Sequence, residues 1–250
     1  MTDAPGSRSG GRPAELQDRL AAVRQRIAAA SAEAALPEPT LIVVTKFFPA
    51  SDVRILAGLG VRDVGENRNQ EAAAKADETA DCVLRWHFIG QLQTNKAKSV
   101  VRYADAVHSV DRAALVGALA KARATENEHR DQRGERPLDP LSCFVQINLD
   151  DAATDTRGGA PPGQVEDLAV RIAGAPELAL AGVMAVAPLG VDPLAAFQRL
   201  GDLAATVRSV DSRATGMSAG MSADLEAAIT AGATHLRIGS DVLGPRPPLR

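Results

Sequence analysis

The alternation of short apolar runs with longer helical patterns most constrains the fold of this chain. Eight short runs have the character of strands, most of them rich in Val, Ile and Leu and the seventh (RATGMS) only weakly so, and segments with apolar residues at three- or four-residue spacing alternate with them. Such alternation predicts a parallel sheet with right-handed crossovers. The expected strands are 41–46, 61–66, 85–90, 105–110, 142–149, 178–186, 213–218 and 234–240, and the expected helices are 14–35, 50–60, 68–80, 93–104, 111–124, 163–174, 192–210 and 222–232.

Eight strand–helix units in a chain of 250 residues favour a single α/β domain, a (β/α)8 TIM barrel. A doubly wound open sheet is the alternative, because periodicity alone does not separate the two. We expect the barrel to span 13–250, after a disordered tail over 1–12 that has no hydrophobic periodicity. We also expect two surface loops, a solvated charged insertion at 125–140 and a loop on the functional rim at 150–163.

Charge and cysteine content exclude several classes of protein. A net charge of -3 gives no reason to expect nucleic acid as a partner. No apolar run reaches the ~20 residues of a membrane-spanning helix, and the first residues lack the apolar core of a secretory signal. Cys82 and Cys143 form no disulfide framework, and the histidines show no metal-ligand spacing. We therefore expect a cytoplasmic protein without a metal site.

Lys46 stands out because the active site of a barrel lies at the carboxyl ends of its strands. It directly follows the buried run LIVVT, whereas Lys75, Lys96, Lys98 and Lys121 fall in helical segments and are expected to be solvated. Partial burial makes an ammonium group lose its proton more readily, which frees the amine for Schiff-base chemistry. The alternative is a rim lysine that pairs with Asp or Glu.

A phosphate site is predicted in the loops after the seventh and eighth strands. These loops read GMSAGMS (216–222) and RIGSDVLG (237–244). Gly and Ser at a helix start leave backbone N–H groups free for an anion, and these two loops form the recurrent phosphate cradle of this barrel. Ser222, Gly239 and Ser240 are the candidates. A helix cap at Ser222 and a plain turn at Gly239 and Ser240 are the alternatives.

A lysine and a phosphate cradle together suit a phosphorylated aldehyde or ketone, either pyridoxal 5'-phosphate (PLP) or a sugar phosphate. Arg237 ends the last strand at the barrel mouth, where it would donate to a pyridine nitrogen and keep it unprotonated. Its alternative is a salt bridge to Asp241 or another carboxylate. Asn67 either touches the ligand or caps a helix, and Met184 is more typical of a core residue. We expect His87 to be a hydrogen-bonded core histidine.

Several segments resemble the pyridoxal phosphate homeostasis protein family, from about residue 15 to the end. The segments that carry the resemblance are LIVVTKFFPASDV (41–53), VGENRNQE (64–71), WHFIGQLQTNK (86–96), HSVD (108–111), MSAGMSADLEAAI (217–229) and LRIGSDVLG (236–244). The resemblance implies a barrel like the amino-terminal domain of alanine racemase, with PLP held on a lysine as an imine. It assigns Lys46 to the imine, Ser222, Gly239, Ser240 and nearby Ser218 to the phosphate, Arg237 to the pyridine nitrogen, and Asn67 and Met184 to the lining.

The sequence departs from the family pattern at a few positions. Phe47 and Phe48 follow the lysine, Ala223 replaces a common acidic residue, and Ser240 replaces a usual threonine while keeping the hydroxyl. The loop at 150–163 lacks a lysine that many members carry, and Arg157 is a candidate substitute.

The resemblance implies a cytoplasmic PLP carrier without catalytic residues. We expect it to be a monomer whose partners are PLP and PLP-dependent apo-enzymes, with no nucleic acid or membrane partner. A PLP-dependent racemase or decarboxylase and a Schiff-base aldolase remain the alternatives.

Overall fold

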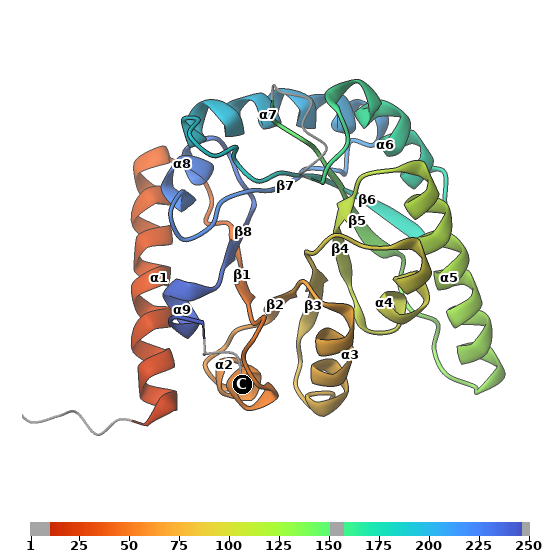
Figure 1. The fold of residues 1–250 in the computed structure, drawn as a ribbon, viewed down its shortest axis with the longest axis horizontal. Coiled ribbons are helices and arrows are strands. Elements are labelled where there is room, and N and C mark those ends of the chain that lie inside the picture. Colours follow the sequence, from red (N-terminus) through yellow and green to blue (C-terminus); the bar gives the residue numbers. More distant parts are fainter. Residues whose placement is uncertain (1–10, 151–157, 247–250) are drawn as a thin grey trace, which may run out of the picture.

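The computed structural model, which describes residues 11–150 and 158–246, contains one closed barrel of eight parallel strands. Successive strands are neighbours, and β1 closes the barrel by pairing with β8 (Figure 1). Closure confirms the predicted TIM barrel and excludes the doubly wound sheet. The strands are β1 (Thr40–Val44), β2 (Asp63–Glu66), β3 (Arg85–Phe88), β4 (Ala106–Val110), β5 (Leu141–Gln146), β6 (Leu178–Met184), β7 (Gly216–Ser218) and β8 (His235–Ile238).

Helices surround the barrel, as the alternation predicts (Figure 1). The first helix, α1, packs against the two short helices near the carboxyl end, α8 and α9. The α-helices are α1 (Arg12–Ala34), α2 (Ala50–Gly58), α3 (Asn69–Glu78), α4 (Ala97–Tyr103), α5 (Ala113–Gln132), α6 (Val165–Ala173), α7 (Pro193–Val210), α8 (Leu225–Thr230) and α9 (Ser240–Leu243), with 3-10 turns η1 (Thr94–Lys96) and η2 (Pro162–Gln164).

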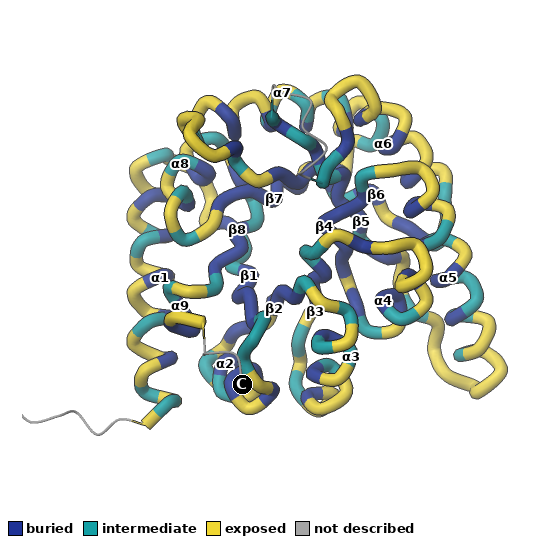
Figure 2. Tube along the Cα trace, viewed as in Figure 1, coloured by how far each residue is buried: buried dark blue, intermediate teal, exposed yellow. Residues whose placement is uncertain are grey.

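The main hydrophobic core lies between the strands and the helices. Alternate strand residues such as Val43 and Val64 point outward and meet the apolar face of helices such as α1, where Leu20 and Ile27 are buried. A smaller apolar cluster of Ala106, Phe144 and Met184 is separate from it. Figure 2 shows buried strands inside a ring of helices whose outer faces are exposed. Other inward-facing strand positions carry buried polar side chains, among them His87, His108 and Arg237.

The charged segment 125–140 differs from its prediction as a loop. Helix α5 continues through its first half and ends at Gln132. Arg123 is buried and donates to the carbonyl oxygens of Val101 and Asp139, and Glu126 pairs with Arg102 and Arg133. These partners hold the charged residues in a helix, because their polar groups are satisfied by the protein rather than by water alone.

Near the two ends of the chain the helices differ in part from the prediction. The predicted tail over 1–12 lies outside the described residues except for its last two, and α1 already begins at Arg12. The predicted helix 222–232 is shorter than expected, because α8 begins only at Leu225. The additional helix α9 follows β8 directly, where the sequence pattern predicts no helix.

Candidate functional site

Lys46 follows β1, and the residue before it is held by several hydrogen bonds. The N–H of Thr45 donates to the Gly65 carbonyl at 2.9 Å, and the Thr45 carbonyl accepts from the Phe48 N–H at 3.1 Å. Lys46 itself is half-buried, and its Nζ has no hydrogen bond or ion pair with any described residue. The alternative of a rim lysine paired with a carboxylate therefore has no support, and the amine is available for a ligand.

Lys75 is not the solvated lysine that its helical pattern predicts. Its Nζ lies 2.5 Å from Glu66 Oε1 and donates to the Thr45 carbonyl at 2.8 Å, and both charged side chains are buried. The Thr45 hydroxyl donates to the same Glu66 oxygen at 2.7 Å. Burial raises the pKa of Glu66, although Lys75 and Thr45 oppose this shift. This pair fixes the backbone from which Lys46 extends.

Phe47 has a backbone conformation that bulky residues rarely adopt. Its φ is 71°, in the left-handed region, at a cost of about 1–3 kcal/mol. Its ring is contacted by three cations: the Lys46 Nζ at 5.8 Å from the centroid, the Arg68 guanidinium at 5.1 Å and the Arg246 guanidinium at 3.9 Å. The surroundings of Lys46 are therefore electropositive and attract an anionic ligand.

The two predicted phosphate loops lie side by side. The Ser222 and Ser240 hydroxyls are 3.3 Å apart, although 18 residues separate them in the sequence. The backbone N–H groups of Ser222, Gly239 and Ser240 find no acceptor within the described part of the chain. Ser222 does not cap α8, since a turn over 221–224 precedes that helix. Two hydroxyls and several free N–H groups together suit a phosphate.

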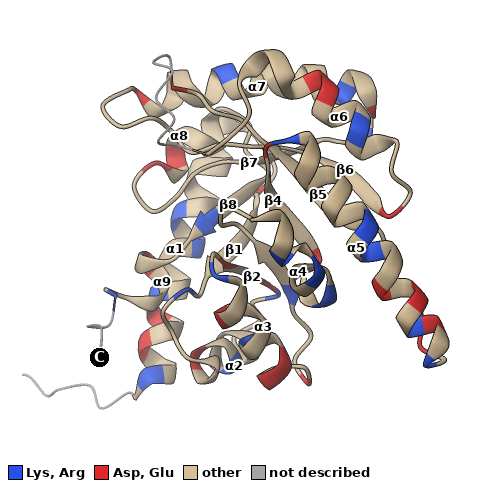
Figure 3. Ribbon diagram, turned by 45° about the vertical axis from the view of Figure 1, so that its right-hand side comes forward, with Lys and Arg blue, Asp and Glu red and all other residues tan. Residues whose placement is uncertain are grey.

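Arg26 of α1 connects these two loops. Its guanidinium donates to the Ser222 carbonyl at 3.1 Å, to Asp241 at 2.7 Å and to Glu226 at 2.9 Å. Asp241 is therefore the partner of Arg26, and the predicted alternative of an Arg237–Asp241 salt bridge is wrong. Figure 3 shows basic residues on α1, the helix that packs against α8 and α9.

Arg237 is buried and uses its guanidinium to join two other strands. One terminal nitrogen donates to the Ser218 hydroxyl at 2.7 Å, and the other donates to the Ala185 carbonyl at 2.8 Å. Burial lowers its pKa to about 10, so the group remains protonated at neutral pH. No carboxylate pairs with it among the residues that the structure describes. Its Nε–H is left as a donor for a ligand.

Asn67 lies at the carboxyl end of β2, beside the loop after β3. A side chain at Gly90 would place its Cβ only 2.3 Å from the Asn67 carbonyl oxygen, so only glycine permits this approach. The Asn67 Oδ1 is buried without a hydrogen-bond partner, and the residue lines a cavity of about 410 Å³. Met184 is buried in the small cluster with Phe144, as its core alternative predicts.

Several of the predicted residues follow or end neighbouring strands at the carboxyl end of the barrel, whereas Asn67 lines a separate cavity and Met184 lies in the core cluster. Because β1 pairs with β8 and β8 pairs with β7, Lys46, Arg237 and Ser218 share one region of the barrel mouth. The serine loops follow β7 and β8 at the same end. A lysine amine, a phosphate cradle and a buried guanidinium match the aldehyde, phosphate and ring nitrogen of PLP. Arg157, the candidate substitute for a lysine, lies outside the described residues.

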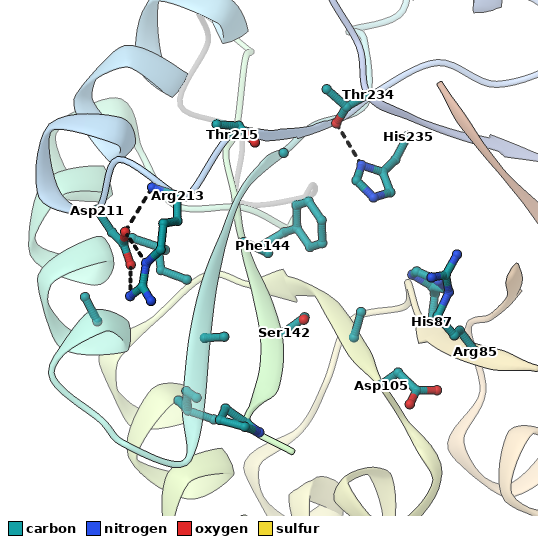
Figure 4. Close-up of a pocket in the computed structure, with 18 of the residues that line it drawn as sticks. Arg85, His87, Asp105, Ser142, Phe144, Asp211, Arg213, Thr215, Thr234 and His235 are labelled. Carbon is teal, nitrogen blue, oxygen red and sulfur yellow. Dashed lines mark hydrogen bonds and ion pairs between the residues drawn. The ribbon is translucent and has the colours of Figure 1, made fainter. Parts of the chain in front are cut away.

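A larger cavity, of about 770 Å³, lies at the opposite end of the barrel (Figure 4). It is lined by residues at the starts of strands, including Asp63, Arg85, His87 and His235. None of the predicted cofactor-binding residues lines it. The sequence predicts His87 as a hydrogen-bonded core histidine, and its ring nitrogens do bond to Asp63 and His108.

Residues 11–150 and 158–246 contain no group of His, Cys, Asp and Glu that could hold a metal ion. Over the same residues, no helix combines the length and the apolar character needed to cross a membrane. Cys82 and Cys143 are both free thiols.

Comparison with known proteins identifies the family. The family model for the alanine racemase amino-terminal domain matches residues 19–247. A pyridoxal phosphate homeostasis protein from Mycobacterium tuberculosis H37Rv is 44% identical over 252 residues, which cover 94% of each chain. The chain belongs to the pyridoxal phosphate homeostasis protein family. A member from Escherichia coli K12 is 33% identical over 240 residues, covering 93% of this chain and 97% of that one.

A solved structure matches nearly the whole chain. PipY of Synechococcus elongatus PCC7942, solved with PLP bound, has a TM-score of 0.76 and 31% identity. The match covers 92% of this chain and 100% of PipY. The predicted family and the predicted alanine racemase type of barrel are thus both confirmed.

Proposed function

We propose that this protein binds PLP on Lys46 and takes part in PLP homeostasis by buffering or delivering the cofactor. The observation that carries the proposal is the position of Lys46, whose amine has no competing partner among the described residues and lies at the barrel end that holds the serine cradle. PLP supplies an aldehyde, which condenses with a primary amine to form a C=N bond and release water. The names of the relatives and the PLP bound to PipY support this proposal.

Each polar group of the site has a role toward the cofactor in this proposal. Ser222, Gly239 and Ser240 bind the phosphate through hydroxyl and backbone N–H groups, and the Ser218 hydroxyl holds Arg237 in place. Arg237 donates to the ring nitrogen, and because a guanidinium has no acceptor, it favours the unprotonated nitrogen. Asn67 lines the cofactor in this arrangement, and its buried Oδ1 is left to accept a hydrogen bond from a ligand, whereas Met184 lies in the core cluster.

We further propose that the protein turns over no substrate of its own. Racemisation requires an acid/base group on each face of the bound substrate. Lys46 supplies one, but the single tyrosine of the chain, Tyr103, lies on α4 against Trp86 and Asn69. Burial also raises the pKa of Tyr103. A monomer in the cytoplasm with PLP-dependent apo-enzymes as recipients fits this role, and its free thiols suit a reducing compartment.

The test is borohydride reduction of the PLP-loaded protein followed by peptide mass mapping. We expect the phosphopyridoxyl group on Lys46 and a loss of the near-visible absorbance in Lys46→Ala. Lys96→Ala is the matched control, because Lys96 lies beside Asn67 in the neighbouring cavity and is the lysine best placed to compete. Labelling of Lys96 or Lys121 in the unmodified protein would refute the assignment.

A second measurement separates the carrier from the racemase alternative. Deuterium exchange at Cα of L- and D-alanine is followed with the PLP-loaded protein, with Lys46→Ala as the background. We expect no exchange above that background. Sustained exchange that depends on Lys46 would establish a racemase-type activity instead.

A further inference from the structure

A chain of hydrogen bonds crosses the barrel interior from the amino-terminal cavity to Arg237. Asp63 Oδ1 lies 2.9 Å from His87 Nε2, and His87 Nδ1 lies 2.9 Å from His108 Nε2. His108 Nδ1 lies 2.9 Å from the Ser218 hydroxyl, which accepts from Arg237 at 2.7 Å. These residues come from β2, β3, β4, β7 and β8. The chain therefore links the two ends of the barrel.

The carboxylate at one end of the chain fixes the direction of the hydrogen bonds in it. A carboxylate only accepts, so His87 carries its proton on Nε2 and donates to Asp63. When both imidazoles are neutral, His87 Nδ1 accepts from His108 Nε2–H, and His108 Nδ1 accepts from the Ser218 O–H. At the other end Arg237 has only donors, so the Ser218 oxygen accepts from it. All donors point from the cation to the anion, and both imidazoles have the same tautomer.

Burial and packing keep this arrangement rigid. His108 and Ser218 are fully buried, and the His108 ring stacks on Phe144 with a centroid distance of 4.2 Å and an interplanar angle of 15°. Burial lowers the pKa of His108 well below its ordinary value, and the nearby Arg237 cation adds to the shift, so the ring is neutral.

The other end of the chain is anchored at the cavity wall. Asp63 also accepts two hydrogen bonds from Arg85, at 2.8 and 2.7 Å. Arg85 and His87 both stand at the cavity wall in Figure 4. The carboxylate therefore has a fixed position, and the chain cannot rotate at this end without breaking an ion pair.

We propose that Asp63, His87 and His108 are positioning residues that set the orientation of Ser218 and, through it, of the Arg237 guanidinium. The guanidinium is held by the Ser218 hydroxyl and the Ala185 carbonyl, and a carbonyl alone would leave it free to pivot. With both contacts in place, the guanidinium plane of Arg237 is fixed, and its remaining N–H groups point in a fixed direction. The effect of this positioning on PLP rests on the proposed function, in which the Arg237 guanidinium donates to the ring nitrogen of PLP.

The tautomers test the chain without any cofactor. Imidazole nitrogen chemical shifts of the unmodified, 15N-labelled protein, recorded without PLP, distinguish protonated from unprotonated ring nitrogens. We expect His87 and His108 both to be neutral with the proton on Nε2. A proton on Nδ1 of His108 would reverse the Ser218 hydrogen bond and overturn the proposal, whether or not the protein binds PLP.

Two isosteric variants test the positioning role. An Asn side chain places its amide near the Nδ1 position of histidine and a Gln side chain places it near Nε2, so His108→Asn retains an acceptor for Ser218 and His108→Gln does not. We expect His108→Gln to bind PLP about 2- to 10-fold more weakly than His108→Asn, the value of one lost hydrogen bond. The absorbance maximum of bound PLP should shift in His108→Gln.

The outcomes separate this inference from the proposed function. Equal affinities and equal spectra for the two variants would show that His108 acts only through packing, and would overturn the positioning role. Failure of the unmodified protein to bind PLP would overturn the proposed function. The measured tautomers of His87 and His108 would still show whether the hydrogen-bond chain has the proposed direction.

Discussion

At the scale of single residues, the sequence identifies functional side chains that directly follow a strand. It does not identify pairs of side chains that contact each other only because the barrel closes. Lys46 is predictable because a cation directly after the buried run LIVVT must face either a ligand or a carboxylate at the strand end. Lys75 is not predictable, because its Ala-rich helix gives no sign that Glu66 is buried beneath it. His87 and His108 interrupt buried strands, which is a signal of polar interior positions, but only strand register shows that they bond to each other.

The buried Lys75–Glu66 pair leads to a prediction about stability. Lys75→Met leaves Glu66 buried without a cation, and breaking a buried pair costs about 3–5 kcal/mol. Glu66 has a pKa raised by burial, so protonation relieves part of the cost at low pH. When folding raises the pKa of a carboxyl group, the free energy of unfolding falls as the pH rises toward and through that raised pKa. We therefore expect a larger loss at pH 8 than at pH 5, measured by urea unfolding.

The matched control for this pair is the double variant Lys75→Met/Glu66→Gln. It removes both charges, so the free energy of unfolding should recover most of the loss and lose its extra dependence on pH. A single variant as stable as the unmodified protein at pH 8 would show that Glu66 does not need Lys75.

At the scale of elements, the site depends on the way α1 covers the ends of β7 and β8. The sequence predicts α1 as an ordinary amphipathic helix, but its contact with two loops more than 190 residues away follows only from barrel closure. The exposed ion pairs of Arg26 contribute little to global stability. Their role is to hold two loops whose serines are 3.3 Å apart. Preorganisation of this kind improves affinity by reducing the entropy lost on binding.

Arg26→Met is therefore expected to weaken PLP binding while leaving the fold intact. Ordering two loops on binding instead of before it should raise the Kd about 2- to 10-fold, the range for one or two immobilised groups. The melting temperature should hardly change. Arg19→Met on the same helix is the control, since Arg19 pairs with Glu15 of its own helix rather than with either loop. Absorbance titration with PLP measures the affinity, and equal Kd values for the two variants would contradict the role of Arg26.

At the scale of the whole molecule, the eight strand–helix units favour the closed barrel, because a sheet of eight parallel strands joined by helices can close so that its last strand pairs with its first. The interior of the barrel could not be predicted in the same way. A two-residue period says which strand residues point inward, but the stagger between strands decides which of them meet. His87, His108 and His235 therefore cluster near Phe144, although their spacing in the sequence does not predict it.

This polar interior makes the stability of the barrel sensitive to acid. Burial lowers the pKa of His235 from 6.5 to about 4, and lowers that of His108 as well. The unfolded chain therefore binds more protons than the folded one below about pH 6.5, and stability falls as the pH decreases toward 4. The pKa of Asp63 is lowered to about 2, despite burial, by His87 and Arg85. Its contribution is present above pH 4 and is lost between about pH 4 and 2.

His235→Gln tests the source of this acid sensitivity because it removes a half-buried imidazole and keeps a polar side chain at the cavity wall. A shift from 6.5 to about 4 corresponds to about 3 kcal/mol of stability lost between those pH values. We expect the free energy of unfolding, measured by urea titration at pH 7, 5.5 and 4, to fall less steeply in His235→Gln by up to that amount. His129→Gln, at an exposed position of α5, should follow the unmodified protein at every pH. Parallel pH profiles for His235→Gln and the unmodified protein would mean that His235 is already protonated inside the folded barrel, and the acid sensitivity would then have to come from His108 and Asp63 alone.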